Sequence, residues 1–455
     1  MARKISISVL LIIFFSQSTI AQQMIGFDSM IRKLATDFET PGIAVAVMKN
    51  YEYKEYFYGY SNLSEKKLLT NKTAFNVASI SKLVTAHVVM QLAEQGKVDL
   101  DKPIQSYLTQ WKFPTSQFDP IQITVRTVLN HSAGLSTEFG PGFSSKDTLL
   151  SLPDILSGKS PKRKALRIIN QPGTEHIYSN LAFGLLQLLV EEVTGQPFQE
   201  YVESNFFSKL NMTKSSFQDP LKLDKNFELA TPYDYRLNPL EQERFVVVAA
   251  AGLQTNLADL EKLMLEESRD KKLLTRKSFD ELHDTSLNTK YGLGHMVSKN
   301  KGNVAFIGHT GLGMGWNASF QFIPGSGDGI IVLTNGDNGF YIHNTLICSW
   351  YYSLSGSYTS ECSVAPDKKL NRISLYLEIA TEQGVLKKQD FETFNNMLEE
   401  SKRSLRNNNF KLFSDQLKTL ESKLKISLTD PAIQKNMREA FQDCYYWIGM
   451  PWFDK

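Results

Sequence analysis

Apolar positions near the start of the chain form two β-type runs. Residues 42–48 read GIAVAVM, and residues 51–60 form a second run that is rich in tyrosine. Lys49 and Asn50 lie between them, and a two-residue polar break between two such runs predicts a hairpin. Further β-type runs follow at residues 305–308, 317–323 and 329–334, with a PGSG turn at 324–327.

The middle of the chain has a mostly helical pattern. An apolar stripe from Leu83 to Ala93, followed by Gly96, predicts a helix over residues 73–96. A second stripe predicts a helix over residues 180–194, which Gly195 ends. Strands, then helices, then strands predict an α+β fold whose terminal strands share one antiparallel sheet.

Past Asp367 the pattern changes to three or four short helices. Two stripes carry it: Leu370, Ile373, Leu377 and Ala380, then Phe413, Leu417, Leu420 and Leu424. Asp430 followed by Pro431 is typical of a helix start, and Gly384 and residues 407–409 are breaks. We expect a C-terminal helical domain over residues 363–455, which could bind a protein partner.

The first 21 residues have the pattern of a secretory signal peptide. Arg3 and Lys4 precede an apolar stretch over residues 5–15, and Thr19, Ile20 and Ala21 form a small-residue cleavage site. The apolar stretch is too short to span a bilayer. We therefore expect an exported protein, periplasmic or secreted, with no transmembrane segment after cleavage.

Composition narrows the class of partner. Lys plus Arg number 50 and Asp plus Glu 48 over 455 residues. Removal of the signal peptide takes away two basic residues and leaves a net charge of zero. A neutral chain gives no support for nucleic-acid binding. The three cysteines, Cys348, Cys362 and Cys444, permit one disulfide in an oxidising compartment. The seven histidines show no metal-ligand spacing, so we expect neither a metal ion nor another cofactor.

Candidate chemistry begins at Ser79-Ile80-Ser81-Lys82. A serine needs a nearby base to act as a nucleophile, and a lysine three residues later on a helix lies on the same face. SxxK occurs five times in the chain, so the motif alone is weak. Ser79 differs from the others because it starts an apolar helix, where backbone N–H groups favour a developing oxyanion. Tyr178-Ser179-Asn180 and His309-Thr310-Gly311 follow downstream.

Together these motifs resemble serine hydrolases of the class C β-lactamase and penicillin-binding-protein family, whose SxxK and KTG signatures are well defined. The resemblance extends over roughly residues 24–358, in the family's order. The matching segments are FNVASISK at 75–82, LNHSAGL at 129–135, PGT at 172–174, YSNL at 178–181, VTGQPF at 193–198 and GHTG at 308–311. It implies a five-stranded antiparallel sheet with flanking helices and an all-helical lobe, in a hydrolase domain over residues 22–362.

The resemblance also implies roles. Ser79 would be acylated, Lys82 would accept its proton, Tyr178 would be a second acid/base, and Asn180 would contact Lys82 and substrate. His309, Thr310 and Gly311 would line the cleft, and the N–H of Leu312 would join that of Ser79 in an oxyanion hole. Lysine acts as a base near pH 7 only if its pKa falls from about 10.4. Whether Lys82 or Tyr178 takes the proton of Ser79 stays open, as does the protonation state of Tyr178.

Position 309 bears on the substrate. Many β-lactamases and carboxypeptidases of the family have lysine there, and its charge attracts a substrate carboxylate. Histidine is mostly neutral at pH 7, so we predict a preference for esters, amides or D-amino-acid peptides without a nearby carboxylate. A β-lactamase or D-alanyl-D-alanine carboxypeptidase proper, with Arg244 as a distant candidate cation, is the alternative. A non-catalytic periplasmic binding or sensor protein is the alternative of another class.

Overall fold

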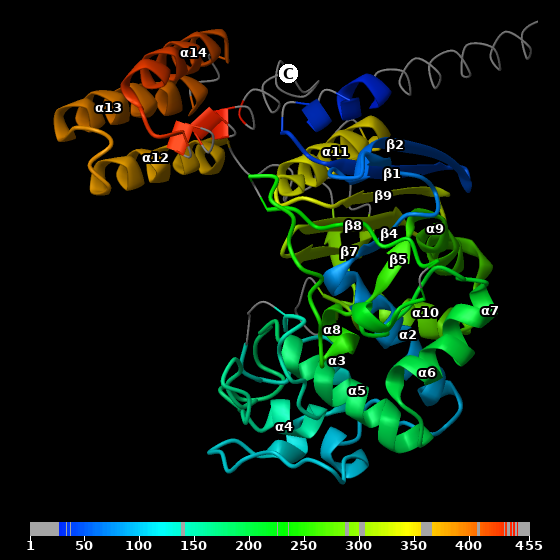
Figure 1. Cartoon of the computed structure of the whole chain (residues 1–455). Helices are drawn as coiled ribbons and strands as arrows, with labels where there is room; N and C mark the ends of the chain where they lie inside the picture. The colour runs from blue at the N-terminus through cyan, green and yellow to red at the C-terminus, as the bar shows by residue number, and fades with distance from the viewer. Residues whose placement is uncertain are drawn as a thin grey trace, which may run out of the picture. The chain divides into compact units, whose positions relative to one another are not determined.

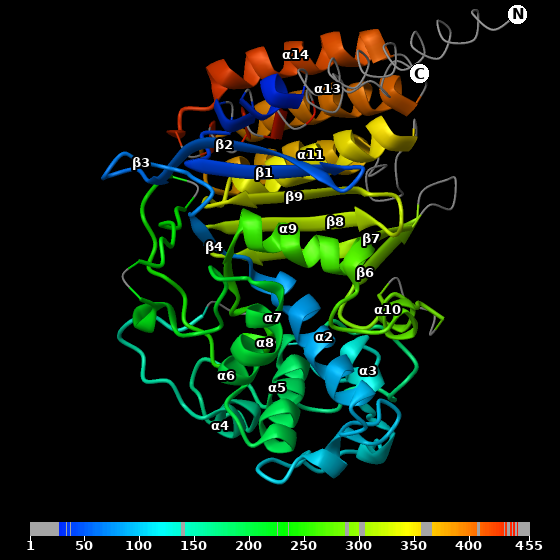
Figure 2. The same cartoon turned by 90° about the vertical axis from the view of Figure 1, so that its right-hand side faces the viewer.

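Seven strands form the main sheet, in the order β3-β2-β1-β9-β8-β7-β6 (Figures 1 and 2). They are β1 (Gly42–Lys49), β2 (Glu52–Asn62), β3 (Lys67–Leu68), β6 (Met296–Lys299), β7 (Ala305–Gly313), β8 (Trp316–Ile323) and β9 (Asp328–Thr334). β1 pairs antiparallel with both β2 and β9. The first and last long strands are therefore neighbours, and the predicted α+β arrangement is confirmed.

The expected number of five strands is wrong by two. The additional strands are at the edges: β3 has two residues and β6 has four. Strands this short carry too little hydrophobic pattern to be recognised in a sequence. The five longer strands, β2, β1, β9, β8 and β7, form the part of the sheet that the family resemblance implied.

The computed structural model describes residues 27–32, 34–36, 38–137, 142–224, 226–234, 236–286, 291–299, 305–355, 366–406, 410–431, 433–434, 437–438, 440–441 and 444. The predicted signal peptide (residues 1–21), Cys362, the predicted domain boundary at residue 362 and the predicted break at 407–409 lie outside these ranges. Among the helices of the described ranges, none combines the length and the apolar character needed to cross a bilayer.

The predicted hairpin has the turn that its sequence requires. Lys49 pairs with Glu52 across a two-residue loop. Asn50 and Tyr51 in that loop both have positive φ, 52° and 65°, as a type I′ turn demands. Asparagine tolerates this conformation better than most residues, so the turn fixes the register of β1 against β2.

A helical lobe and a small second sheet complete the unit that contains the long strands (Figure 2). The α-helices are α2 (Ser81–Glu94), α3 (Val125–Leu129), α4 (Leu152–Leu156), α5 (Asn180–Thr194), α6 (Phe198–Val202), α7 (Ser208–Leu210), α8 (Val248–Ala251), α9 (Leu257–Leu265) and α10 (Arg276–Leu282). Short 3₁₀ or π turns are η1 (Ala78–Ile80), η2 (Ile104–Tyr107), η3 (Pro120–Gln122), η4 (Glu203–Phe207), η5 (Pro220–Lys222) and η6 (Glu266–Asp270). α9 contacts β1 and β9, whereas α2, α5 and α8 contact one another.

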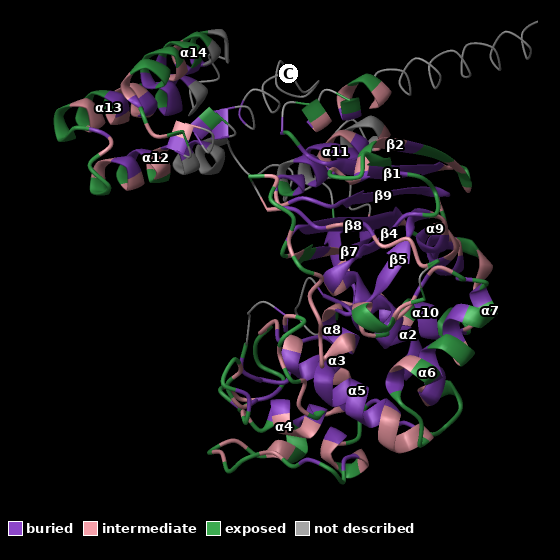
Figure 3. Ribbon diagram, in the orientation of Figure 1, coloured by how far each residue is buried: buried purple, intermediate pink, exposed green. Residues whose placement is uncertain are grey.

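The helix predicted over residues 73–96 begins later than expected. Ala74–Asn76 is strand β4, which pairs antiparallel with β5 (Gln254–Asn256). The partner strand lies far away in the sequence, so local pattern could not reveal it. The helix proper, α2, is buried all round from Ser81 to Leu92 (Figure 3). The predicted helix over residues 180–194 is confirmed as α5, which Gly195 ends with φ 69°.

The chain divides into two units, Met1–Met296 with Ile307–Ile342 and Val297–Phe306 with His343–Lys455. The later helices are α11 (Gly339–Ser355), α12 (Pro366–Glu382), α13 (Lys388–Arg406) and α14 (Phe410–Ser427). The predicted stripes of α12 and α14 are buried in one hydrophobic cluster. Asp430 accepts a hydrogen bond from the Ile433 N–H at 2.9 Å, as expected of a helix start.

Candidate active site

The candidate nucleophile lies on a strained turn. Ser79 is the middle residue of η1, directly before α2. Ala78 has φ 43°, a left-handed conformation that costs a non-glycine residue of order 1–3 kcal/mol. The Ala78 N–H donates to Asn76 Oδ1 at 2.9 Å, and the Val77 N–H donates to the Leu253 carbonyl at 3.0 Å. These bonds tie the turn to β4 and to the segment before β5.

Lys82 joins three parts of the chain at the serine. Its Nζ lies 3.0 Å from Ser79 Oγ, 2.8 Å from Asn180 Oδ1 and 2.8 Å from the Ala250 carbonyl oxygen. Ser79 and Lys82 are one helical turn apart, as the SxxK spacing predicts. Asn180 is the first residue of α5 and Ala250 lies in α8. Nothing in the sequence pointed to the Ala250 carbonyl, because any residue type supplies one.

The surroundings of Lys82 favour its neutral form. The side chain is fully buried, and burial lowers the pKa of Lys82 well below its usual value. A neutral amine has two N–H donors and one lone pair. Asn180 Oδ1 and the Ala250 carbonyl are both acceptors, so they take the two donors. The lone pair then faces Ser79 Oγ, which is the arrangement a general base requires.

Tyr178 approaches the same serine from the segment directly before α5. Its hydroxyl donates to Ser79 Oγ at 2.9 Å. Burial raises the pKa of Tyr178 above its usual value, and the hydrogen bond with Ser79 offsets only part of that increase. A phenolate base would need the opposite direction of shift, so the raised pKa favours the protonated hydroxyl of Tyr178.

His131 positions Tyr178 and was not among the predicted site residues. Its Nδ1 accepts from the Ser179 N–H at 3.3 Å, and its ring centroid lies 4.3 Å from that of Tyr178. Ser179 caps α5 by accepting from the Ala182 N–H. His131 is buried and has φ 60°. These contacts give His131 a structural role next to Tyr178.

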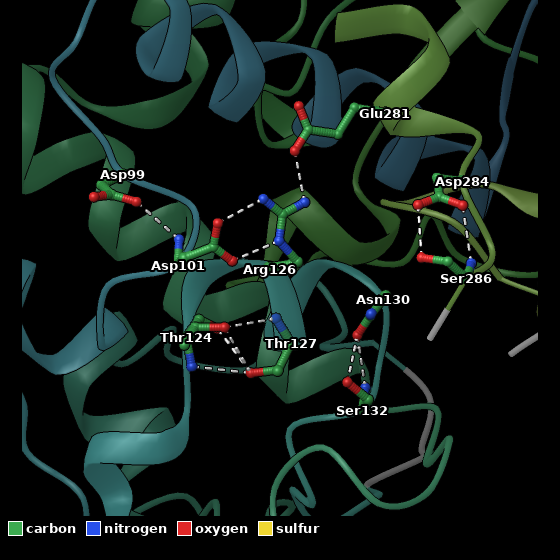
Figure 4. A network of polar contacts seen from close by, with 10 residues as sticks. All are labelled: Asp99, Asp101, Thr124, Arg126, Thr127, Asn130, Ser132, Glu281, Asp284 and Ser286. Carbon is green, nitrogen blue, oxygen red and sulfur yellow. Dashed lines mark hydrogen bonds and ion pairs between the residues drawn. The ribbon is translucent and has the colours of Figure 1, made fainter. Parts of the chain in front are cut away.

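A polar network holds the segment before His131 in place (Figure 4). Thr124 and Thr127 form a capping box at the start of α3. Arg126 donates twice to Asp101 and once to Glu281. Asn130 Oδ1 accepts from both the N–H and the Oγ of Ser132. These contacts fix the turn on which His131 adopts its left-handed backbone.

Strand β7 passes directly beside the serine. A Cβ placed on Gly311 would lie 2.0 Å from the Val77 carbonyl oxygen and 3.4 Å from the Ser79 amide nitrogen. Only glycine fits at this distance. The backbone of β7 therefore lies beside the Ser79 N–H, where the expected oxyanion hole would be. Leu312 follows with its side chain exposed, and Thr310 is half-buried with Oγ1 3.8 Å from the Met296 sulfur.

His309 is turned inward. It is 2% exposed, its Nε2 lies 2.7 Å from the Tyr291 hydroxyl, and its Nδ1 lies 2.6 Å from the Thr310 carbonyl. A carbonyl only accepts, so Nδ1 carries the proton and Nε2 accepts from Tyr291. Burial, helped by the nearby Lys82, lowers the pKa of His309 to about 3. Both ring nitrogens of His309 therefore form hydrogen bonds within the protein.

A small cavity adjoins the Lys82 partners. Asn180 and Ala250 line it together with Phe143, Ile155, Arg163, Leu181, Phe245, Val246, Val247 and Ala251. Arg163 is the cation in this lining. Its charge lowers the pKa of Glu243, although burial, the larger effect, raises it. Arg244, the cation suggested by the sequence, instead forms an ion pair with Asp219 at 2.6 Å and donates to the Ser144 and Asp147 carbonyls.

Comparison with known proteins places the chain among β-lactamase relatives. A model of the family described as Beta-lactamase matches residues 27–345. "Protein flp" of Staphylococcus aureus (strain NCTC 8325 / PS 47) is 23% identical over 323 residues, which are 69% of this chain. The chain spans 63% of that relative's length.

Two solved structures share the fold. The octameric penicillin-binding protein homologue from Pyrococcus abyssi has a TM-score of 0.62 and 23% identity, covering 78% of this chain and 81% of its own. A D-stereospecific amidohydrolase from Streptomyces sp. has a TM-score of 0.55 and 22% identity, covering 68% and 94% respectively. The α+β fold expected from the sequence resemblance is confirmed.

Proposed function

Because the chain belongs to the β-lactamase family, which it matches over residues 27–345, we propose that it is a serine hydrolase that forms an acyl-enzyme on Ser79. The proposal rests on the contacts of Ser79 Oγ, which lies 3.0 Å from Lys82 Nζ and 2.9 Å from the Tyr178 hydroxyl. A base on one side and a proton donor on the other are what acyl transfer needs.

In the proposed acylation, Lys82 takes the Ser79 proton as Oγ attacks the substrate carbonyl. The N–H groups of Ser79 and Leu312 stabilise the oxyanion. When the carbonyl re-forms, the bond to the leaving group breaks, and Tyr178 gives that group its proton. The ammonium of Lys82 then returns a proton to Tyr178. In deacylation, water takes the place of the serine and attacks the carbonyl of the acyl-enzyme as it gives up a proton to a base of the site. The bond to Ser79 Oγ then breaks, Oγ is reprotonated, and the acid is released.

The proposed substrates are esters or amides without a carboxylate near the scissile bond. His309 is neutral and turned inward, and Arg163 lies close enough to Glu243 to interact with its charge. Leu312 in β7 and Met314 directly after this strand are exposed apolar side chains. These features support an uncharged, apolar substrate group. A carboxylate-bearing β-lactam or D-amino-acid peptide is the second candidate, because Arg163 lines the cavity beside Asn180.

Export belongs to the proposal as well. Residues 1–21 carry the signal pattern described above. Cys348 forms a disulfide, a bond that is typical of oxidising compartments and supports a periplasmic or secreted location.

Fluorophosphonate labelling followed by intact-mass measurement tests the nucleophile. We expect one adduct per chain, lost in Ser79→Ala. The matched control is Ser64→Ala, because Ser64 starts another SxxK motif and is exposed. Absence of an adduct in folded wild-type protein, or its loss in the Ser64 variant alone, would contradict the proposal and favour a binding protein.

Substrate class is tested by kcat/KM for nitrocefin and for a p-nitrophenyl short-chain ester at pH 6 and pH 8. We expect the ester to dominate, with the same ratio at both pH values, because His309 stays neutral throughout. Efficient nitrocefin turnover would favour the carboxylate-binding alternative. Loss of that turnover in Arg163→Gln would then identify the cation responsible.

A further inference from the structure

A second cluster of titratable side chains lies one and a half turns further along α2. His87 on α2, Glu267 on η6 and His295 before β6 bring one donor atom each to within 4.8 Å of one another. Glu267 Oε1 lies 2.8 Å from His295 Nε2 and 3.5 Å from His87 Nε2. All three side chains have no exposed surface. None of them takes part in the mechanism proposed for Ser79.

Backbone contacts fix which nitrogen of each ring faces the carboxylate. His87 Nδ1 lies 2.9 Å from the Leu83 carbonyl, and His295 Nδ1 lies 2.7 Å from the Leu293 carbonyl. Because carbonyls only accept, both Nδ1 atoms carry protons. In a neutral ring the other nitrogen, Nε2, then carries no proton and offers a lone pair. Two lone pairs and a carboxylate oxygen therefore point at a common position.

This arrangement requires a positive charge between the three groups. A buried carboxylate without a compensating positive charge is strongly destabilising. Protonation of His295 would satisfy the contact to Glu267, but His87 Nε2 would remain buried and without a hydrogen bond among the residues that the structure describes. Protonation of both rings would bury two cations beside a single anion. A divalent cation satisfies both lone pairs and the carboxylate at once.

We propose that His87, Glu267 and His295 bind a zinc ion. Imidazole nitrogen and carboxylate oxygen are ligands that zinc prefers, and a ring that donates Nδ1–H to a carbonyl while offering Nε2 is the usual form of a metal-bound histidine. Ligands about 2.0–2.1 Å from a tetrahedral zinc lie roughly 3.4 Å apart. The separation of His87 Nε2 from Glu267 Oε1, 3.5 Å, is close to this value, whereas that of His295 Nε2, 2.8 Å, must lengthen by about half an ångström.

Further side chains surround the three proposed ligands and keep the position closed to a substrate. His283 Nε2 lies 3.1 Å from Oε2, the second oxygen of the Glu267 carboxylate. Phe206 and Phe279 pack edge-on against the His87 ring. The three side chains have no exposed surface, so a substrate has no access to the ion and its role is structural. The zinc ion would link α2, which contains Lys82, to the segment that contains Tyr291 and His295.

Metal content and thermal unfolding test the site. The full-length protein, produced without a polyhistidine tag, is loaded with Zn²⁺, dialysed, and measured by elemental analysis. We expect about one zinc per chain, and a melting temperature that falls by several degrees when a chelator removes it and returns when Zn²⁺ is added back. Co²⁺ in place of Zn²⁺ should give visible d–d absorption bands.

Variants identify the ligands. His87→Gln and Glu267→Gln should lose the zinc and the chelator-dependent change in melting temperature, whereas His176→Gln, at an exposed histidine, should keep both. If the ligand variants fail to fold, the wild-type titration with Zn²⁺ and chelator still decides. Less than stoichiometric zinc after loading, together with a melting temperature that neither Zn²⁺ nor chelator changes, would overturn the proposal and leave a protonated His295–Glu267 pair.

Discussion

At the scale of single residues, the central question is whether Lys82 acts as a base or as a cation. Its two acceptor partners and its burial favour the neutral amine. Lys82→Arg distinguishes the two roles, because arginine keeps the charge and the donors but cannot lose its proton in a protein. We expect kcat/KM for the p-nitrophenyl ester to fall by about 10²–10⁴-fold, the usual contribution of a general base.

The control for this variant is its melting temperature and its circular dichroism, which establish that the larger side chain is accommodated. Near wild-type turnover in a folded Lys82→Arg protein would mean that the charge, not the base, is needed. Tyr178 would then be the acceptor of the Ser79 proton.

His309 makes a second prediction, on pH and stability. Its folded-state pKa of about 3 lies below the usual 6.5, so the unfolded chain binds a proton that the folded chain does not. Stability from this residue is therefore present above pH 6.5 and is lost as the pH falls toward 3. Between pH 7 and pH 5 the loss is about 2 kcal/mol.

Urea unfolding of the wild-type protein and of His309→Gln at pH 7 and pH 5 measures this loss of stability. The glutamine does not titrate, so we expect the variant's free energy of unfolding to change by about 2 kcal/mol less than that of wild type. Equal pH dependence in the two proteins would show that His309 titrates normally. The other histidines are common to both proteins and cancel in the difference.

Residue roles were only partly predictable from the sequence. Ser79, Lys82, Tyr178 and Asn180 were recognised through motifs, and the structure brings their polar atoms together. Their actual roles in catalysis stay predictions until tested. The inward turn of His309 depends on the Tyr291 hydroxyl, 18 residues away on another segment, and no local pattern encodes such a partner.

At the scale of elements, catalysis depends on how closely β7 approaches η1. Gly311 has no side chain at the point where a Cβ would lie 2.0 Å from the Val77 carbonyl. Gly311→Ala must push the strand away from the turn and so displace one wall of the oxyanion hole. We expect kcat to fall by about 10²-fold or more, as when one oxyanion donor is lost.

Gly313→Ala is the matched control, since a Cβ there meets nothing closer than Glu243 Oε2 at 3.3 Å. It lies on the same strand, two residues further on. We expect near wild-type acylation by the fluorophosphonate in this variant. Equal acylation rates in the two alanine variants would mean that the close approach of β7 has no catalytic role.

Elements with strong local patterns were predicted well, and those that depend on distant partners were not. α5 has the predicted bounds, Asn180–Thr194, because its capping serine and terminal glycine are both local signals. β4 was mistaken for the first turn of a helix because its partner β5 lies about 180 residues later. The burial of α2 on all sides likewise follows from elements that pack on it, not from its own stripe.

At the scale of the whole molecule, the site depends on contacts between distant segments. β1 pairs with β9 across almost 300 residues, and Lys82 meets Ala250 over 168 residues. The His87–Glu267–His295 cluster has the same character, since its members are far apart in the sequence and show no metal-ligand spacing along it. Spacing in sequence finds only ligands that share one helix or one loop.

The C-terminal helices raise the last question at this scale. The buried residues of α12, α13 and α14 form a hydrophobic cluster of their own, and the family match ends at residue 345. Every side chain placed at Ser79 comes from earlier in the chain. A chain ending at Ala365 should therefore fold and take the fluorophosphonate adduct on Ser79 at the wild-type rate. Ser79→Ala in the same shortened chain is the blank for the mass measurement. A shortened chain that unfolds cooperatively yet takes no adduct would mean that the helices supply something the chemistry needs, and the separation of catalysis from residues 366–455 would have to be given up.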